Sequence, residues 1–283
     1  MATSDSVLLA SGMVATLEPD RWHPGRVELV VAGTPQSSVN LGDPTDLGYE
    51  YVERIGHVVD LLAPERAPIT AVHFGAGALT IPRYVAATRP GSRQQVVELE
   101  RELVDFVRER LPLPKDASIR IRYGDAREVA ERLPEGLHGA ADLVVVDVFA
   151  GARIPAPVTT TEFYSLAVRL LAPTGVLAVN VADGAGLRFA RGQIATVRAV
   201  LPEVAVLAEP QVLKGRRFGN LVIVASRAPL PMPWLPRLVA SGPHPASAVS
   251  GEDLAELVRD AVPVTDATAT GSPEPDQAMF LER

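Results

Sequence analysis

Acidic residues stand at the ends of several short apolar segments, and a pair of glycines follows another. Gly75 and Gly77 come directly after the segment 69–74, and Glu98 lies about twenty residues beyond them. Glycines permit a tight turn and close approach to a ligand, and a carboxylate at that spacing can accept hydrogen bonds from both ribose hydroxyls. The pattern predicts a nucleotide site. A purely structural turn and a solvated acid at Glu98 or Glu100 are the alternatives.

Two further acidic residues end the next apolar segments. Asp125 comes after the segment 118–123, and Asp147 ends the segment 142–147. Because ligands bind at the carboxyl ends of strands in parallel sheets, both side chains are expected at one crevice. Asp125 could accept a hydrogen bond from an adenine amino group, cap the following helix, or do both. Asp147 precedes a glycine-containing loop long enough to cover a substrate, and a simple turn residue is its alternative.

The elements that must hold these side chains alternate along the chain. Short apolar strands are expected over 69–74, 94–99, 118–123, 142–147 and 175–180, with helical segments between them. This alternation predicts an α/β fold with a doubly wound, mostly parallel, Rossmann-like sheet of seven strands. The last two strands, 204–208 and 220–225, are joined by only about eleven residues. That connection is too short for a helical crossover, so the pair should be antiparallel.

Capping signals indicate where two of the helices begin. Pro82 suits the first turn of a helix expected from about Leu79, because that turn needs no N–H from it. Thr159 and Glu162 have the spacing of a capping box before a second apolar helical segment.

The chain divides into three predicted regions. Residues 1–62 form an N-terminal β-hairpin region with a linking helix, because alternating apolar residues precede turn signals there. Residues 63–226 form the nucleotide-binding catalytic domain. Residues 227–283 contain nine prolines and form a tail packed on that domain, mostly as loop, with one amphipathic segment over 252–262.

Composition excludes several classes of function. With 283 residues, of which 47% are hydrophobic, the chain can form a substantial core. A net charge of −7 without a basic cluster argues against a nucleic acid partner. No long apolar segment or secretory signal is recognised, so we expect a cytoplasmic protein without membrane association. The lack of Cys excludes disulfides and thiolate metal sites, and the five His show no ligand spacing, so no metal is expected.

Six segments, in order along the chain, resemble the motifs of the spermidine synthase family. They are GAGALTIPR, VVELERELVDF, YGDAREVAERLP, LVVVDVFAG, TTTEFY and LAPTGVLAVN. The preceding GTPQSSVNL and YEYVERIGHV are similar to that family's N-terminal hairpin and linking helix. The family consists of aminopropyltransferases built on the fold of class I methyltransferases. The resemblance covers roughly residues 25–226.

The resemblance implies roles for single residues. Those assigned to the nucleoside are Gln36, the loop residues Gly75 and Gly77, the ribose acid Glu98, and the adenine-reading pair Asp125 and Ala126. Tyr51 matches a tyrosine of the substrate pocket. Asp147 matches the first aspartate of a catalytic D-x-x-D loop, which accepts or orients the attacking amine. Tyr164 lies in the EFY segment, where core packing is the alternative to substrate contact.

The chain departs from the family pattern at three positions. Ala78 and Ala150 replace aspartates of the glycine-rich loop and of D-x-x-D, and Val52 replaces the usual Gln or His. Because those carboxylates help to hold ammonium groups, their loss bears on the substrate and not on the nucleoside.

The resemblance implies transfer of an aminopropyl group from decarboxylated S-adenosylmethionine to a small amine acceptor. Methyl transfer from S-adenosylmethionine, on the same nucleoside site, is one alternative. A catalytically silent homologue that binds nucleoside is another. Either donor would be a co-substrate, no metal is implied, and the family's habit suggests a homodimer or homotetramer.

Overall fold

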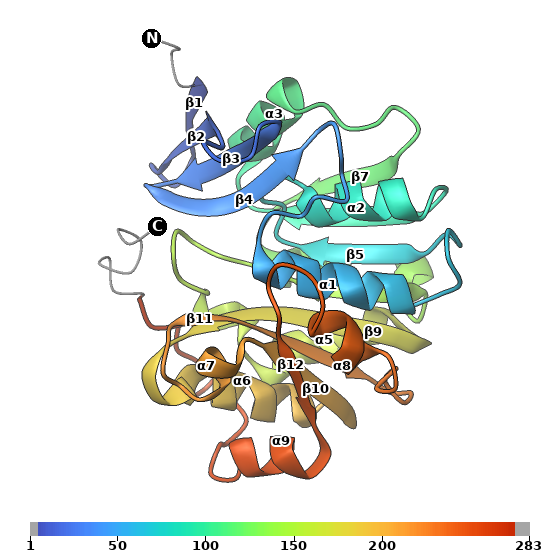
Figure 1. The fold of residues 1–283 in the computed structure, drawn as a ribbon, viewed down its shortest axis with the longest axis vertical. Coiled ribbons are helices and arrows are strands. Elements are labelled where there is room, and N and C mark those ends of the chain that lie inside the picture. Colours follow the sequence, from blue (N-terminus) through green and yellow to red (C-terminus); the bar gives the residue numbers. More distant parts are fainter. Residues whose placement is uncertain (1–4, 275–283) are drawn as a thin grey trace.

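The computed structural model describes residues 5–274, which form two β-sheets with helices around the larger one (Figure 1). The strands of the larger sheet are β5 (Thr70–Phe74), β6 (Arg93–Glu98), β7 (Ser118–Tyr123), β8 (Ala141–Val146), β9 (Leu171–Asp183), β10 (Glu203–Ala208), β11 (Gly219–Ser226) and β12 (Ser247–Ser250). Their order across the sheet is β12-β10-β11-β9-β8-β5-β6-β7.

The direction of the strands confirms the expected fold class. β5 to β9 run parallel to one another, whereas β11 is antiparallel to both β9 and β10. The sheet has eight strands and not the seven expected, because β12 pairs antiparallel with β10. Its four residues, SAVS, lie in the proline-rich tail and carry too weak an apolar pattern to be recognised.

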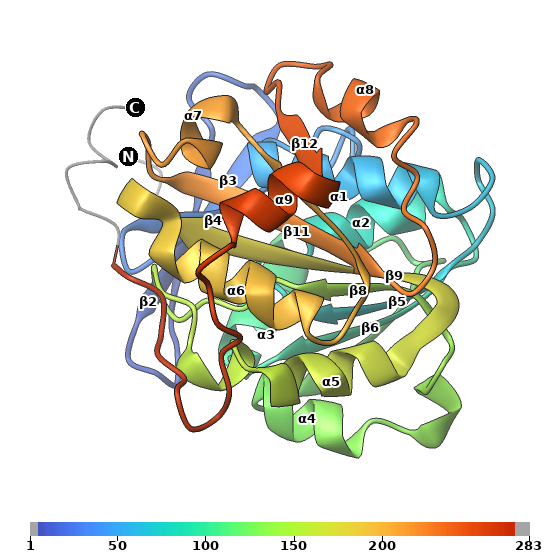
Figure 2. The ribbon, with the colours of Figure 1, turned by 90° about the horizontal axis from the view of Figure 1, so that it is seen from below.

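Helices cover both faces of this sheet (Figure 2). They are α1 (Glu50–Leu61), α2 (Thr80–Thr88), α3 (Arg101–Arg110), α4 (Ala126–Arg132), α5 (Thr161–Leu170), α6 (Arg188–Arg198), α7 (Pro210–Leu213), α8 (Leu235–Val239) and α9 (Gly251–Leu257), with short 3-10 turns η1 (Glu135–Leu137), η2 (Ala156–Val158) and η3 (Ala185–Leu187). Apolar side chains of α1, α2 and α8 pack on one face of the sheet, and those of α4, α5, α6 and α9 on the other.

The start of α5 differs from the expected capping box. Thr160, and not Thr159, is the N-cap, and its hydroxyl accepts a hydrogen bond from the Phe163 N–H over 3.2 Å. Thr159 instead ends η2, where its own hydroxyl donates to the Ala156 carbonyl. The preceding 3-10 turn therefore displaces the helix start by one residue.

The smaller sheet contains the antiparallel strands β1 (Asp5–Leu8), β2 (Val14–Pro19), β3 (Arg26–Val31) and β4 (Thr34–Asn40), in that order. Its buried residues alternate along β2 and β3, and they share an apolar cluster with α3. In Figure 1 this sheet stands above the larger sheet.

The C-terminal tail contributes more structure than a covering loop. Besides β12 it contains α8 and α9, and α9 forms within the segment expected to be amphipathic. The division into regions 1–62, 63–226 and 227–283 stays a prediction, and residues 1–4 and 275–283 lie outside the described part of the chain.

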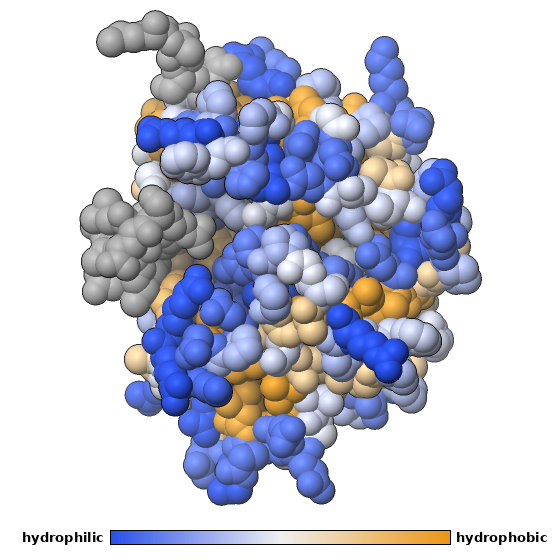
Figure 3. Space-filling model, in the orientation of Figure 1, coloured by the Kyte–Doolittle hydropathy of each residue, from blue (hydrophilic) through white to orange (hydrophobic). Residues whose placement is uncertain are grey.

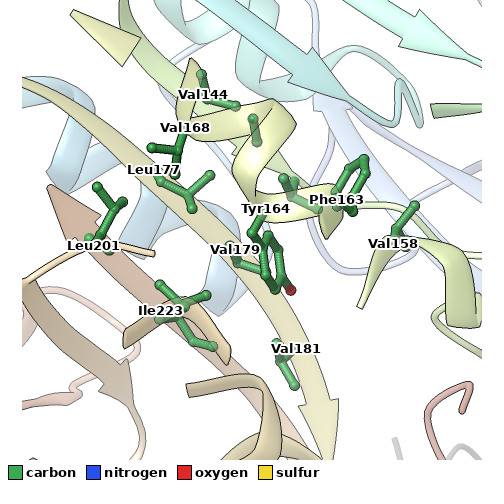
Figure 4. Packing of buried hydrophobic residues seen from close by; sticks show 14 of the residues in the cluster. Val144, Val158, Phe163, Tyr164, Val168, Leu177, Val179, Val181, Leu201 and Ile223 are labelled. Atoms are coloured by element: carbon green, nitrogen blue, oxygen red, sulfur yellow. The ribbon is translucent and has the colours of Figure 1, made fainter. Parts of the chain in front are cut away.

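The hydrophobic core lies between the larger sheet and its helices. Tyr164 belongs to it: the ring packs beside Phe163 and Val179 (Figure 4), and its hydroxyl donates to Gln193 Oε1 over 2.8 Å. The core alternative for Tyr164 is therefore the one observed. Hydrophilic residues cover most of the face shown in Figure 3. Within residues 5–274, no helix combines the length and the apolar character that a membrane span requires.

Candidate active site

All of the site residues predicted from the sequence line one cavity of about 190 Å³ at the carboxyl ends of β5, β6, β7 and β8. They are Gln36, Tyr51, Gly75, Gly77, Glu98, Asp125, Ala126 and Asp147. The N-terminal sheet closes the cavity with Leu29 and Val31 of β3. The topology thus brings together residues from the whole N-terminal half of the chain, and their individual roles stay predictions.

The glycine loop is shaped by close backbone approach. Gly75 has φ +93° and Gly77 φ +49°, both in the left-handed region that favours glycine. A Cβ on Gly75 would collide with the Asp147 carbonyl, and one on Gly77 with the Ser37 hydroxyl. Both glycines therefore let the loop lie against β4 and the end of β8.

Glu98 fastens this loop to the start of α3. Its Oε2 accepts a hydrogen bond from the Ala76 N–H and its Oε1 accepts one from the Glu100 N–H, each over 2.9 Å. Burial raises the pKa of the Glu98 carboxyl, and the backbone donors partly offset that effect. Each oxygen retains a second lone pair, so the carboxylate is still able to accept hydrogen bonds from ribose hydroxyls.

Asp125 is the N-cap of α4. Its Oδ1 accepts hydrogen bonds from the N–H groups of Arg127, over 2.9 Å, and Glu128, over 3.1 Å. The capping alternative is therefore observed. Because both bonds use Oδ1, Oδ2 stays able to accept from a ligand, and the adenine contact remains a prediction.

Asp147 is held by the amide of Asn180. Asn180 Nδ2 donates to its Oδ1 over 2.8 Å, while the nearby Tyr51 hydroxyl donates to the Gln36 carbonyl over 3.4 Å. Burial raises the pKa of Asp147, while Asn180 and the Tyr51 hydroxyl favour its charged form and limit the rise. Burial, reinforced by the nearby charge of Asp147, raises the pKa of Tyr51, which keeps that hydroxyl protonated as a donor.

Asn180 was missed in the sequence, although a signal for it exists. In the parallel pair of β8 and β9, Val146 lies opposite Val179, so Asp147 and Asn180 are the next residues of adjacent strands. Once this register is known, the polar residue that ends the apolar segment 175–180 is expected beside Asp147. The sequence alone did not determine the register of those two strands.

A second cavity, of about 420 Å³, adjoins the first. The two share Gln36, Tyr51, Phe149 and Gly151 in their linings, and the second continues between the N-terminal sheet, the first turn of α1, β9 and β11. Asp147 lines the smaller cavity and its partner Asn180 lines the larger. The hydrogen-bonded pair therefore lies where the two spaces meet.

The positions that depart from the family pattern lie in different surroundings. Ala78 is fully buried before α2, and its N–H donates to the Ser37 hydroxyl. Val52 is buried in the core cluster of α1. Ala150 is exposed in the loop after Asp147 and lines the smaller cavity. Among these three, only position 150 lies on the cavity.

The tail holds the loop that follows Asp147. Ile154 N–H donates to the Ser272 hydroxyl over 2.9 Å, and Ser272 N–H donates back to the Ile154 carbonyl over 3.0 Å. Beside it, the guanidinium of Arg127 forms two hydrogen bonds of 2.6 Å with the Asp266 carboxylate. The segment 264–274 is therefore a strap across the outside of the loop that follows Asp147.

Metal-binding groups are not evident in this part of the chain. Within residues 5–274 no cluster of three or more His, Cys, Asp or Glu is placed to hold a metal ion. His73 is buried and its Nε2 bonds Gln94 Oε1 over 2.9 Å, and burial lowers its pKa to about 4. It is therefore a neutral core residue.

Comparison with known proteins places this arrangement in a family. No family model matches the chain. It is 31% identical to a probable spermidine synthase from Corynebacterium glutamicum ATCC 13032, whose crystal structure superposes with a TM-score of 0.84 over 94% of this chain and 97% of that one. The crystal structure of a spermidine synthase from Thermotoga maritima, 15% identical, shares the fold with a TM-score of 0.58 over 83% of this chain and 78% of that one.

A curated relative gives a shorter match. The chain is 30% identical over 169 residues to a polyamine aminopropyltransferase of Vibrio vulnificus (strain CMCP6), covering 59% of this chain and 52% of that protein. It thus spans about half the length of the curated relatives it matches first. The likeness to the Corynebacterium structure, in contrast, extends over nearly all of both chains. On that identity, and on the fold it accompanies, the chain belongs to the spermidine synthase family.

Proposed function

We propose that the protein transfers an aminopropyl group from decarboxylated S-adenosylmethionine to an amine acceptor. The observation that carries the proposal is the position of Asp147, a carboxylate fixed by Asn180 at the meeting point of two cavities. The smaller space is lined by the residues that we assign to the nucleoside of the donor, and the larger leaves room for an acceptor.

The reaction asks little of the protein beyond alignment and proton transfer. The lone pair of the acceptor nitrogen forms a bond to the aminopropyl carbon attached to the sulfonium, and the C–S bond breaks. Its electron pair goes to sulfur, which leaves neutral methylthioadenosine. The nitrogen that has gained the aminopropyl group loses a proton to Asp147, which passes it on to water. Asp147 must therefore be ionised at the start, and Tyr51 and Asn180 favour that state.

The same geometry would support methyl transfer, because both donors share the nucleoside and the sulfonium. Family membership favours the aminopropyl group. S-adenosylmethionine stays a competing donor because Ala150, which lines the smaller cavity, replaces an aspartate of the family pattern. Without that negative charge, the site has less to repel the donor's own carboxylate.

Mass spectrometry of the products tests the proposal. The purified chain is incubated with either donor and a set of primary amines, and Asp147→Asn serves as the inactive control. Methylthioadenosine together with an aminopropylated amine is the expected result. S-adenosylhomocysteine with a methylated product would assign methyl transfer. No turnover, with calorimetric binding of methylthioadenosine retained, would assign a silent nucleoside-binding protein.

We also propose that the protein forms a homo-oligomer through its N-terminal sheet. Leu8 and Val14, which lie opposite each other on β1 and β2, are 66% and 47% exposed. Burying this apolar pair against a second copy would remove it from water. Sedimentation of the wild type and of Leu8→Ser/Val14→Ser tests this, because a dimer or tetramer of wild type that dissociates in the variant is expected.

A further inference from the structure

The loop of residues 148–158, which follows Asp147, forms part of the wall of both cavities. Residues 148–151, 155, 157 and 158 line the smaller cavity, and Phe149 and Gly151 line the larger one as well. At the tip of the loop, the Ala150 N–H donates to the Arg153 carbonyl over 2.8 Å and closes a tight turn. The position of this loop therefore sets the shape of the smaller cavity.

Two other segments hold this loop, one from each side. On the side of the cavities, Gln36 Nε2 of β4 donates to the Gly151 carbonyl over 3.1 Å. On the outside, Ser272 exchanges its two hydrogen bonds with Ile154, and its carbonyl also accepts from Arg153 Nε over 3.0 Å. Ser272 is 1% exposed and Ile154 is 6% exposed, so these bonds are shielded from water. The strap thus meets the loop through three bonds at one buried serine.

The other end of the strap is fixed to three helices. The Val264 carbonyl accepts from the N–H of Thr161, the first residue of α5, and the Val264 N–H donates to the Thr196 hydroxyl of α6, each over 2.9 Å. Asp266 is paired with Arg127 of α4. Figure 2 shows this segment, drawn in red after α9, running beside α6. The strap therefore ties the loop to the helical layer that packs on the larger sheet.

The contact between strap and loop leaves little freedom of position. A Cβ on Gly271 would lie 3.1 Å from the Ile154 carbonyl oxygen, so the two backbones approach more closely than most side chains allow. Buried backbone N–H groups are nearly always paired, and a buried N–H that loses its partner is costly. The loop can leave its observed position only by breaking the bonds to Ser272. The strap therefore restricts the loop from outside the cavities.

We propose that the strap holds the loop of residues 148–158 in the conformation that binds the nucleoside of the donor, with Ser272 as a positioning residue. This inference rests on the proposed function, because it uses the nucleoside site assigned there. Ser272 lies outside the linings of both cavities, so it acts through Ile154 and Arg153. Coupling between two sites is reciprocal, so nucleoside binding and closure of the strap favour each other by the same factor.

Calorimetry tests one direction of this coupling. Ser272→Ala leaves the buried Ile154 N–H without its partner and raises the population of loop positions that do not bind the nucleoside. Methylthioadenosine should therefore bind Ser272→Ala at least about threefold more weakly than wild type. Thr270→Ala is the matched control, because Thr270 is an exposed residue of the same strap whose side chain takes no part in these hydrogen bonds. It should bind methylthioadenosine as wild type does.

Amide hydrogen exchange tests the other direction, and on wild type it requires no variant. A segment that opens locally is protected by a ligand only if its opening is coupled to binding. Saturating methylthioadenosine should therefore slow exchange in wild type both over 148–158 and over 264–274, although the strap does not line the smaller cavity. In Ser272→Ala, the nucleoside should slow exchange over 148–158 alone.

The outcomes separate this inference from the proposed function. Exchange over 264–274 that methylthioadenosine leaves unchanged in wild type, or slows equally in Ser272→Ala, would overturn the inference alone. Equal affinity of Ser272→Ala and wild type for methylthioadenosine would do the same. A wild-type chain that binds no methylthioadenosine would refute the nucleoside site, and both proposals with it.

Discussion

Removing the amide of Asn180 should shift the pH range in which the enzyme works. In Asn180→Ala, Asp147 loses the Nδ2–H donor that lies 2.8 Å from its Oδ1. Burial already raises the pKa of Asp147, and the lost donor is one of two that oppose the rise. The substitution therefore raises the pKa further, and a base that must be ionised becomes inactive at a higher pH.

The size of the shift follows from the energy of the lost bond. A hydrogen bond to a charged group contributes about 1.5–3 kcal/mol, and about 1.4 kcal/mol corresponds to one pH unit. Because the Asn180 donor stabilises the ionised carboxylate more than the neutral acid, the acid limb of kcat should move upward by up to about one to two pH units. Well above that limb, Asp147 is ionised in both proteins, and the variant should recover most of its rate.

The assay is methylthioadenosine release as a function of pH, with both substrates saturating so that kcat is measured. Asn220→Ala is the matched control. Asn220 lines the same cavity as Asn180, and its backbone carbonyl accepts a hydrogen bond from Arg54 over 3.1 Å, which survives the substitution. Its acid limb should stay at the wild-type position. A limb in Asn180→Ala that moves no further than in Asn220→Ala, or moves to lower pH, would refute Asp147 as the titrating base.

Three other substitutions test separate parts of the site. Asp147→Asn should lower kcat by roughly a hundredfold or more while methylthioadenosine affinity stays within about threefold. Its Tm should exceed that of wild type near pH 7, where burial disfavours the charged carboxylate of wild type, but not below about pH 3, where Asp147 is neutral in both the folded and the unfolded chain. Glu98→Ala should weaken the binding of methylthioadenosine and S-adenosylhomocysteine by about 1–3 kcal/mol, measured by calorimetry. Glu102→Ala, at an exposed position, is the control. Undiminished binding of both ligands to Glu98→Ala would contradict the ribose assignment. Wild type should bind S-adenosylmethionine and its decarboxylated form with Kd values that differ by less than about tenfold, and a hundredfold preference would contradict this reasoning. Ala150→Asp should shift the Kd ratio toward the decarboxylated donor. Ala78→Asp should mainly lower Tm, because it buries a charge.

The sequence predicted the position of the site residues well where acidic residues or glycines follow the ends of predicted strands. Gly75, Glu98, Asp125 and Asp147 could be placed at one crevice because parallel strands end at a common edge, and these residues do line one cavity. The antiparallel pair of β10 and β11 followed from a connection too short for a crossover. Both inferences use features of short sequence segments, namely a strand end and a loop length, that strongly restrict how the strands can be arranged.

The features that were missed depend on contacts between distant segments. β12 is recognisable as a strand only when β10 is beside it, because its four residues have no apolar pattern of their own. Asn180 becomes a site residue only through its register with β8. The hydrogen bonds between Ile154 and Ser272 likewise join residues 118 positions apart, and no pattern in the proline-rich tail indicated them.

The strap formed by residues 264–274 has a consequence for how the enzyme matures during synthesis. Ile154 can form its hydrogen bond only after Ser272 has been added to the growing chain, 118 residues later. Arg127 can pair only after Asp266 has been added, 139 residues later. The parallel strands that carry Glu98, Asp125 and Asp147 are complete long before either partner exists. A chain arrested after about residue 262 lacks both partners, so the strap can hold the loop that follows Asp147 only after residues 264–274 have been added.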